Sequence, residues 1–286
     1  MEEQKFNSEL NEYKVVENKQ DGYTKQLYWN LAIGLQQVDG LTPSEYLLEL
    51  SKKHIDGEIT NEELEVMLKQ YYSTKNTNDK KVSEKKECDL VSARIVELIS
   101  EDTFSLHPTS MKVIHKYLFD GIYDFAGKYR TYDITKEEVI LNGDSAHYFS
   151  YIQIEEALDY DFNEEKKYSY SNLTLEEVVK HIATFTSRIW EVHPFGEGNT
   201  RTTAVLIVKY LRSLGYKVDN NLFKEHSVYF RNALVRSNYS NSFKNISTTE
   251  KYLIKFYENL LLGTKHELRS RDLVVEELFK KNDNEE

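Results

Sequence analysis

Apolar residues recur at helical spacing along most of the chain. Within residues 23–38 they fall three or four positions apart, which places them on one face of a helix. Gly40 follows, and glycine commonly ends a helix in the left-handed conformation. By the same criterion we expect a short helix over 44–54 and a third from about residue 61 to Tyr72. The pattern predicts a small three-helix unit at the N-terminus.

Two polar stretches divide the rest of the chain. Residues 73–87 contain a single apolar residue, Val82, and are predicted to form a polar linker or a frayed helix end. The last residues, KKNDNEE, are typical of a disordered tail. The predicted organisation is residues 1–72 as the N-terminal helical unit, 73–87 as the linker, 88–262 as the main domain, and 263–286 as a C-terminal helix with the tail.

The main domain is predicted to be helical around one buried helix. Residues 202–215 are apolar on nearly all sides, as in a helix that others surround. Thr174 and Glu177 have capping-box spacing and predict the start of the helix before it. The exception is residues 127–149, where β-branched residues and the Asn142-Gly143 pair predict a short hairpin. The predicted fold class is therefore mostly α, with one β-hairpin.

Charge and composition argue against several classes of protein. The net charge is −11 and the sequence pI is about 5.4, which disfavours a nonspecific binder of nucleic acid or of an anionic membrane. Cys88 is the single cysteine, so no internal disulfide can form. The N-terminus lacks a secretory signal core, and no apolar run approaches the roughly 20 residues that a membrane helix needs. We expect a soluble, cytoplasmic protein; secretion as an effector without such a signal stays open.

One stretch, EVHPFGEGNTR at 191–201, breaks the helical pattern. It holds one of the chain's three prolines and two of its eleven glycines, between two strongly apolar segments. Gly196 and Gly198 let the backbone curl without a Cβ clash. The helix that follows begins with unpaired N–H groups and a partial positive charge, and such groups can converge on one anion. The stretch is therefore predicted to bind phosphate.

The polar side chains of this stretch suit a phosphate reaction. Arg201, in the first helical turn, can contact a phosphate with both arms of its guanidinium. Asn199 can cap the helix and donate an amide N–H to phosphate, and Glu197 can hold Mg²⁺ together with phosphate oxygens and waters. His193 can take a proton near neutral pH. Together they predict transfer from a phosphate ester to a hydroxyl group; ordinary turn and capping roles are the alternative.

The segment HPFGEGNTR resembles the signature of the Fic family, H-P-F-x-[DE]-G-N-[GK]-R, at every defined position except Thr200. GKYRT at 127–131 and the predicted hairpin resemble the flap with which that family aligns a target segment by strand-like pairing. The resemblance covers about residues 88–262 and implies a Fic-type helical core. It also implies transfer of AMP from ATP, with Mg²⁺, to a Ser, Thr or Tyr hydroxyl of a target protein, including this chain itself.

The resemblance assigns roles position by position. It makes His193 the base and Glu197 the Mg²⁺ ligand. The implied ATP-binding residues are Phe195, which also anchors the loop, Gly196, Gly198, Asn199, Thr200, Arg201, Tyr229 and Asn232, the last two at the adenine. The implied flap edge is Val139, Ile140 and Leu141.

Thr200 stands where Gly or Lys is usual in the family. Its backbone N–H is still available, so the anion site is expected to survive. A Lys at 200 together with an Ala at 198 would resemble the related Doc branch, which phosphorylates. Neither is present, which favours nucleotidyl transfer.

Residues 24–72 resemble the small three-helix antitoxin of the VbhA type. In that family an inhibitory glutamate pairs with a second arginine, three residues beyond the signature arginine, and displaces the ATP γ-phosphate. Here the corresponding positions hold Asp39-Gly40 and Ala204. Because both ends of that ion pair are altered, the resemblance implies weak inhibition and constitutive activity, including self-modification. A purely structural cap is the alternative for these residues.

Other functions stay open. The same site could use another donor such as UTP, could remove AMP, or could be a catalytically silent toxin–antitoxin scaffold, although the intact His193, Glu197 and Arg201 argue against silence. A metal hydrolase is disfavoured, because the histidines show no close ligand spacing. The target protein and the choice between monomer and homo-oligomer do not follow from the sequence. The resemblance implies the cytoplasm of a bacterium as the compartment.

Overall fold

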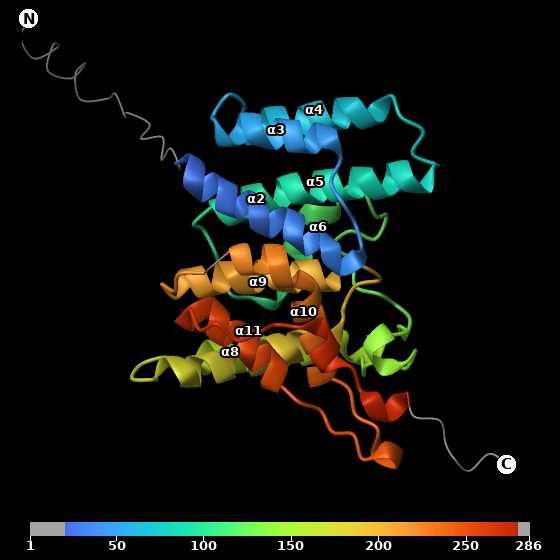
Figure 1. The fold of residues 1–286 in the computed structure, drawn as a ribbon, viewed down its shortest axis with the longest axis vertical. Coiled ribbons are helices and arrows are strands. Elements are labelled where there is room, and N and C mark those ends of the chain that lie inside the picture. The colour runs from blue at the N-terminus through green and yellow to red at the C-terminus, as the bar shows by residue number, and fades with distance from the viewer. Residues whose placement is uncertain (1–20, 219, 280–286) are drawn as a thin grey trace, which may run out of the picture.

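The computed structural model describes residues 21–218 and 220–279. Within them the chain is mostly helical, as predicted (Figure 1). The α-helices are α2 (Gly22–Gln36), α3 (Glu45–Ile55), α4 (Asn61–Ser73), α5 (Lys80–Ser100), α6 (Pro108–Phe119), α7 (Ile154–Lys167), α8 (Leu175–Val192), α9 (Asn199–Ser213), α10 (Asn221–Ser237) and α11 (Lys251–Leu262). No described helix is both long and apolar enough to span a membrane.

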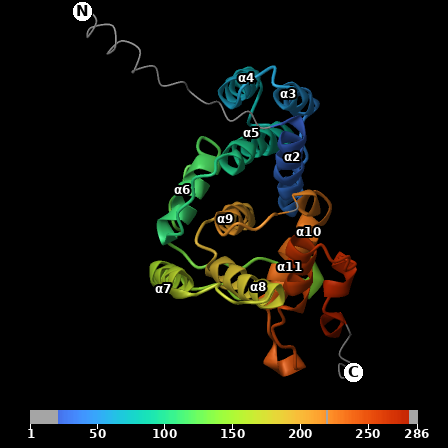
Figure 2. The same ribbon diagram turned by 90° about the vertical axis from the view of Figure 1, so that its left-hand side faces the viewer.

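Helix α9 is the centre of the fold, as predicted from its all-round apolar sequence. Every residue from Asn199 to Leu211 is buried. The helix contacts α2, α5, α6 and α8, and Figure 2 shows it nearly end-on with other helices around it. The loop at its N-terminus, residues 193–198, is therefore held on several sides.

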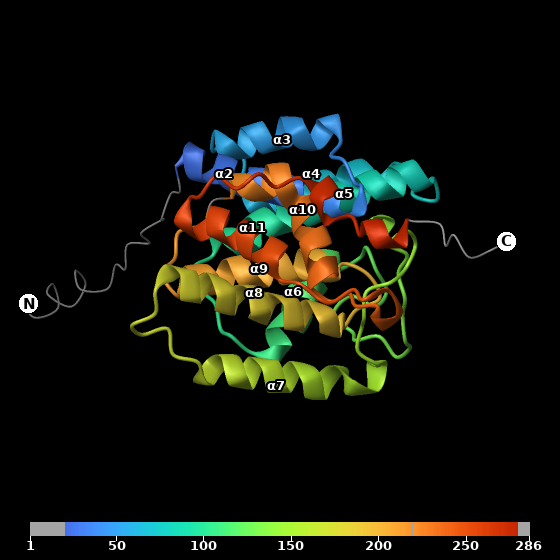
Figure 3. The same cartoon turned by 60° about the horizontal axis from the view of Figure 1, so that its bottom comes forward.

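The N-terminal unit is part of this packed structure. Helix α2 lies against α5 and α10, while α3 and α4 form a pair on its far side (Figures 1 and 3). Gly34 allows the close approach of α2 to α10, because a Cβ there would lie 2.5 Å from the Cα of Lys224. Leu31, Ala32 and Leu35 are fully buried beside it. Residues 21–73 thus share one hydrophobic core with the described residues that follow them.

The predicted linker over 73–87 is shorter in the structure. Helix α4 ends at Ser73, and α5 begins at Lys80, where Asp79 caps it by accepting from the N–H of Lys81 at 2.8 Å. The linker prediction was wrong for residues 80–87, and the alternative of a helix end is nearer, because the first turns of α5 extend beyond the core and are helical and polar at once. These turns carry Glu87, whose carboxylate accepts a hydrogen bond from Arg201.

Helix α7 was not predicted. Its buried residues include Ile154, Leu158 and Phe162, which are four positions apart and form one helix face against α8. Figure 3 shows α7 at the opposite side of the molecule from α3. The many charged residues between these three positions concealed the pattern.

The predicted β-hairpin is not confirmed, because residues 127–149 contain no strand. Asn142 and Gly143 do form the predicted tight turn, with φ values of 54° and 88°, and the Asp144 N–H donates to the Leu141 carbonyl at 3.1 Å. The residues before it, Val139–Leu141, form the 3₁₀ turn η2. That turn directs Ile140 and Leu141 into the core, which a flat hairpin edge would not do.

The end of the described chain differs from the predicted C-terminal helix. Residues 263–279 contain two 3₁₀ turns, η5 (Ser270–Leu273) and η6 (Glu276–Leu278), instead. The Val275 N–H donates to the Ile140 carbonyl at 3.0 Å, so this segment lies against η2. The predicted disordered tail, residues 280–286, lies outside the described residues.

Candidate active site

The loop between α8 and α9 is built on two left-handed residues. His193 ends α8 with φ 46° and ψ 59°, and Gly198 precedes α9 with φ 78°. A Cβ at Gly198 would also lie 2.5 Å from the Phe119 ring, so glycine is required there for space as well as for conformation. A histidine at positive φ is uncommon and is found where the surrounding structure fixes it.

His193 is held as a neutral imidazole. Its Nδ1 lies 3.1 Å from the Trp190 carbonyl, which can only accept a hydrogen bond, so Nδ1 carries the proton and Nε2 is left as the basic atom. Burial, together with the positive charges of Lys136, Arg231 and Arg130, lowers the pKa of His193 to about 3, although the hydrogen bond with the Trp190 carbonyl acts to raise it. The ring is thus unprotonated near neutral pH.

Tyr148 covers this imidazole. Its ring centroid lies 4.3 Å from that of His193, and the Tyr148 hydroxyl is buried without a hydrogen bond among the described residues. His193 itself is 8% exposed and does not line the neighbouring cleft. The structure therefore places the predicted base beside the cleft, under Tyr148, rather than in its wall.

Arg130 fixes the loop at the histidine end. Its Nε donates to the His193 carbonyl at 2.9 Å, and its Nη2 donates to the carbonyls of Val192 and Phe149. Its backbone N–H donates to the Pro194 carbonyl at 2.8 Å. The carbonyls of Val192 and His193 lie at the C-terminal end of α8, where carbonyls have no partner within the helix and favour a positive charge. Arg130 therefore acts as the C-terminal cap of α8.

Phe195 and His115 fix the middle of the loop. Phe195 is fully buried, in agreement with its predicted anchoring role, and stacks on His115 at a centroid distance of 3.8 Å. The Gly127 N–H donates to Nδ1 of His115, so Nε2 donates to the Glu197 carbonyl at 3.0 Å. Burial lowers the pKa of His115 to about 4. A neutral histidine thus supports the loop beside Glu197.

Asn199 and Thr200 serve the loop itself in this structure. Asn199 is the first residue of α9, not its cap, and its side-chain amide bonds to the N–H and the carbonyl of Phe195 at 2.9 and 2.8 Å. The Thr200 hydroxyl accepts from the indole N–H of Trp190 at 3.0 Å. The prediction that Asn199 caps α9 was therefore wrong: its side chain closes the loop.

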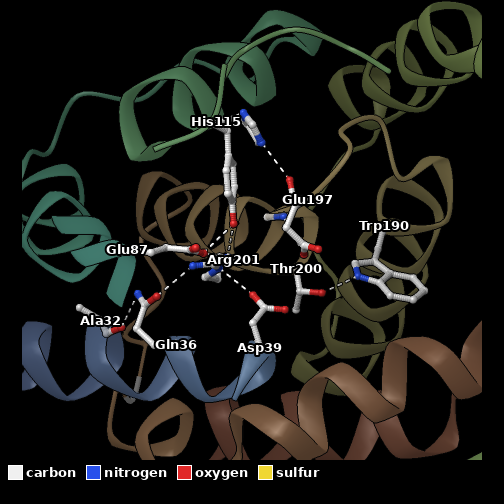
Figure 4. A network of polar contacts seen from close by, with 11 residues as sticks. Ala32, Gln36, Asp39, Glu87, His115, Trp190, Glu197, Thr200 and Arg201 are labelled. Carbon is white, nitrogen blue, oxygen red and sulfur yellow. Dashed lines mark hydrogen bonds and ion pairs between the residues drawn. The ribbon is translucent and has the colours of Figure 1, made fainter. Parts of the chain in front are cut away.

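Arg201 lies at the centre of a polar network (Figure 4). It is fully buried, and its Nη atoms donate to Gln36 at 3.0 Å and to Glu87 at 2.7 Å. Asp39 places a carboxylate oxygen 2.9 Å from Nε, but outside the direction of the N–H bond, so this contact is an ion pair. Among the described residues Nε–H makes no hydrogen bond.

The two carboxylates determine the charge state of this arginine. Burial alone would lower the pKa of Arg201, but Asp39, Tyr123 and Glu87 together raise it above its ordinary value. The carboxylate oxygens occupy positions that phosphate oxygens could take, because both are anionic acceptors of similar reach. The predicted inhibitory residue Asp39 therefore has a partner, which is Arg201 itself and not a residue at position 204.

Glu197 and Arg201 face one cleft of about 760 Å³. Its walls come from η1 (Gln37–Asp39), α5, the loop at 136–140, α10 and the segment at 270–274. The Oε1 atom of Glu197 accepts from the Gly198 N–H at 3.1 Å. No cluster of three or more histidine, cysteine or carboxylate side chains able to hold a metal is present in residues 21–218 and 220–279.

The other predicted site residues separate into two groups. Val139, Ile140 and Asn232 line the cleft, and Val139 is 90% exposed. Leu141 and Tyr229 are buried and do not line it; the Tyr229 hydroxyl donates to the Tyr252 carbonyl at 3.2 Å. The structure thus brings Asn232 to the cleft and leaves Tyr229 in the core.

Three residues that organise this site were missed from the sequence. Arg130, His115 and Glu87 contact the loop from 63 to 114 positions away in the chain. Each is a single polar residue within an otherwise ordinary helix or loop, so spacing gives no signal. Arg130 stands in the GKYRT segment, whose position beside the predicted flap was the one available hint.

Comparison with known proteins matches residues 105–211 to the model of the Fic/DOC family. The chain is 28% identical over 163 residues to "Protein adenylyltransferase VbhT" of Bartonella schoenbuchensis, covering 57% of this chain and 32% of that protein. It is 28% identical over 129 residues to "Probable protein adenylyltransferase y4lH" of Sinorhizobium fredii, covering 44% and 62%. The chain thus spans less than two-thirds of the length of either relative.

Two solved structures also match in part. One is the N-terminal FIC domain of the effector Bep8 from Bartonella sp. 1-1C, with a TM-score of 0.47 and 20% identity over 60% of this chain and 81% of that one. The other is the N-terminal Fic domain of an effector protein from Bartonella sp. AR 15-3, with a TM-score of 0.49 and 16% identity over 65% and 86%.

Proposed function

We propose that this chain, in which residues 105–211 form a Fic/DOC family domain, is a protein adenylyltransferase. It transfers AMP from ATP to a hydroxyl side chain of a target protein. The two relatives named as adenylyltransferases support this assignment. The structural observation that carries it is Arg201, a fully buried guanidinium surrounded by anionic acceptors in a cleft that Glu197 shares.

The reaction follows from the two ends of the loop. The oxygen of a target hydroxyl attacks the α-phosphorus of ATP and forms the new P–O bond. The bond between the α-phosphorus and the α,β-bridging oxygen breaks, and pyrophosphate leaves with its electron pair. Nε2 of His193 takes the hydroxyl proton, which it can do because the imidazole is neutral and its Nδ1 is committed to Trp190. Arg201 and the first N–H groups of α9 hold the phosphates. Access to Nε2 requires Tyr148 to shift from the imidazole.

Glu197 fits the role of Mg²⁺ ligand. Its carboxylate borders the cleft next to Arg201, and Mg²⁺ is commonly held by one carboxylate together with phosphates and waters. When bound, Mg²⁺ would neutralise phosphate charge. The cleft has an excess of acidic residues in its walls, so a nucleotide with its own cation would enter more easily than a free one.

The residues that line the cleft suggest where the adenine of ATP and the target protein bind. Val139 and Ile140, with Val228 and Val274, provide apolar surface near Asn232, which suits the adenine. The exposed Val139 at the tip of η2 is available to contact a target segment bearing Ser, Thr or Tyr, this chain included. We do not retain Tyr229 as a nucleotide contact, because it lies in the core.

The N-terminal unit restrains the site through Arg201 in this proposal. Gln36 and Asp39, at the end of α2 and in η1, reach the same guanidinium that is needed for phosphate. Gly40 ends η1 with φ 70° and keeps Asp39 directed at Arg201. We therefore revise the expectation of weak inhibition: Ala204 removes one partner for Asp39, but Arg201 supplies another.

Mass spectrometry of the full-length chain after incubation with ATP and Mg²⁺ tests the function. We expect the mass of one or more AMP groups to be added to the chain or to an added target, and the His193→Ala variant to lose at least about 100-fold in rate. Labelled UTP in a parallel reaction tests the nucleotide preference. Equal modification by wild type and His193→Ala would contradict the proposal.

A further inference from the structure

A triphosphate needs more than one cationic contact, and α9 offers one. Beyond Arg201, the next turn of α9 holds Thr202, Thr203 and Ala204, all buried and none charged. The other cationic side chains of the cleft are Lys136, Arg231 and Arg271. In addition to Mg²⁺ and the N–H groups of α9, a second cationic side chain for the phosphates would be one of these three.

Arg231 is the one whose guanidinium is fixed. Its Nη1 and Nη2 donate to the two carboxylate oxygens of Glu138 at 2.7 and 2.8 Å, and the two side chains are 13% and 3% exposed. Arg271 is 76% exposed and lies 3.9 Å from Asp272, and Lys136 carries a single point charge on a flexible chain. A buried, oriented guanidinium binds phosphate with less ordering cost than either.

Arg231 also lies between the groups that the phosphates would reach. It lines the same cleft as Glu197, Arg201 and Asp39, and it lies within electrostatic range of both His193 and Asp39, the ion-pair partner of Arg201. A guanidinium has five N–H donors, and the pair with Glu138 uses two of them. Arg231 can therefore keep Glu138 and still donate to a phosphate oxygen.

We propose that Arg231 is a second phosphate-binding residue of the nucleotide site, with Glu138 as its positioning residue. The inference rests on the proposed nucleotide function of the cleft. It means that the two phosphate contacts come from different helices, α9 and α10, and that the loop at 136–140 is tied to nucleotide binding through Glu138.

Calorimetric titration of the full-length chain with ATP, inorganic tripolyphosphate and adenosine, each with Mg²⁺, tests the inference. Arg231→Gln is expected to weaken binding of ATP and of tripolyphosphate at least about tenfold, and to leave adenosine binding unchanged. Arg271→Gln removes the same charge from the same cleft and is expected to have a much smaller effect. An equal loss in both variants, or an equal loss for adenosine, would overturn the inference.

The variant Glu138→Gln distinguishes a phosphate-binding role of Arg231 from a role in which Arg231 only anchors the loop at 136–140. If Arg231 only anchored the loop, Glu138→Gln would weaken ATP binding as much as Arg231→Gln; we expect a clearly smaller effect. Since Arg231→Gln leaves the buried Glu138 unpaired and could impair folding, the double variant Glu138→Gln/Arg231→Gln is measured too. It removes both charges and is expected to show the same loss for ATP as Arg231→Gln.

The outcomes also distinguish this inference from the proposed function. If the wild type binds ATP and transfers AMP, and Arg231→Gln does both equally well, the inference fails and the function stands. If the wild type binds neither ATP nor tripolyphosphate, both are contradicted.

Discussion

The two ends of the segment 193–201, which comprises the loop and the first residues of α9, are held in different ways. At the histidine end, Arg130 and Trp190 fix the backbone and the ring through hydrogen bonds with main-chain carbonyls. At the arginine end, the partners of Arg201 are side chains of Gln36, Asp39 and Glu87, which come from other elements. The first set of contacts is internal to the main domain; the second joins it to the N-terminal unit and α5.

This difference follows from what each end must do. A base has to keep one tautomer and one orientation through the reaction, and carbonyls of α8 cannot be exchanged for a ligand. An arginine that binds phosphate has to be released from its resting partners, and carboxylates that reach water can be displaced by another anion. Asp39 and Glu87 side chains are 18% and 17% exposed, so they retain access to solvent. A ligand can thus replace the partners of Arg201, whereas the carbonyls that hold the histidine end cannot be replaced.

The largest effect is expected from breaking the histidine end. Arg130→Met keeps the length of the side chain but leaves the buried carbonyls of Val192 and His193, and the partly buried carbonyl of Phe149, without their donor. Each such loss costs about 1–3 kcal/mol, so we expect the free energy of unfolding to fall by about 3–5 kcal/mol. Urea unfolding at neutral pH measures it.

Arg201→Met is the matched variant at the other end. It removes a buried guanidinium of the same size, but the carboxylates left behind can turn toward water. We expect a loss of stability smaller by about 2 kcal/mol than for Arg130→Met. A loss from Arg201→Met as large as that from Arg130→Met would show that both ends are equally rigid, and the comparison would fail.

A smaller effect is expected from acid, which acts on the loop through His115. Its pKa is about 4 in the folded chain against an ordinary value of 6.5, so the folded state binds fewer protons than the unfolded state between these values. Stability therefore rises with pH from about 4 to 6.5 and is level above. Lowering the pH from 7.5 to 5 should cost about 2 kcal/mol through this group.

His115→Gln should reduce the difference in unfolding free energy between pH 7.5 and pH 5 by that amount. His54 and His193, whose pKa values are also lowered, to about 4 and about 3, keep their share of the pH dependence in the variant. His107→Gln, at the exposed N-cap of α6, is the control. An unchanged pH difference in His115→Gln would mean that the histidine is not held neutral beneath the loop.

Local patterns in the sequence predicted much of the fold. The all-round apolar residues of α9 predicted its central position, and Thr174 with Glu177 marked the start of α8 through a capping box that the structure contains. The Asn142-Gly143 pair predicted its turn but not its strands, because the burial of Ile140 and Leu141 in the core overrides strand pairing. Helix α7 was missed although its buried residues Ile154, Leu158 and Phe162 stand four positions apart in the sequence.

The site residues that are close together in the sequence could be predicted, and those that reach the site only through tertiary packing could not. The loop glycines, His193, Glu197 and Arg201 stand within nine consecutive residues, so their chemistry could be considered together. Arg130, Glu87 and Arg231 meet the site through tertiary packing, and a single charged residue gives no sign of its partner. For the same reason the sequence named Asp39 but assigned it no partner, since Arg201 lies 162 positions further along.

The smallest of these effects, and the most direct test of exchangeability, is expected from Asp39→Asn. The variant keeps the size of the side chain and removes the charge that competes with phosphate for Arg201. If the Asp39 pair must open before ATP binds, its cost lowers the apparent affinity for ATP by the same factor. We expect Asp39→Asn to raise ATP affinity, and AMP transfer at low ATP, by about tenfold.

Removing the whole N-terminal unit would be a poorer test, because Leu31, Ala32 and Leu35 belong to the common core and their loss would expose it. Glu84→Gln is the better control, since Glu84 is a carboxylate in the same cleft whose ion pair is with Lys80, while the ion-pair partners of Arg201 among the described residues are Asp39 and Glu87. If Glu84→Gln raised ATP affinity as much as Asp39→Asn, the general acidity of the cleft would be responsible. If Asp39→Asn left the affinity unchanged while ATP still bound, Asp39 would be a structural partner of Arg201, and the arginine end would be as permanent as the histidine end.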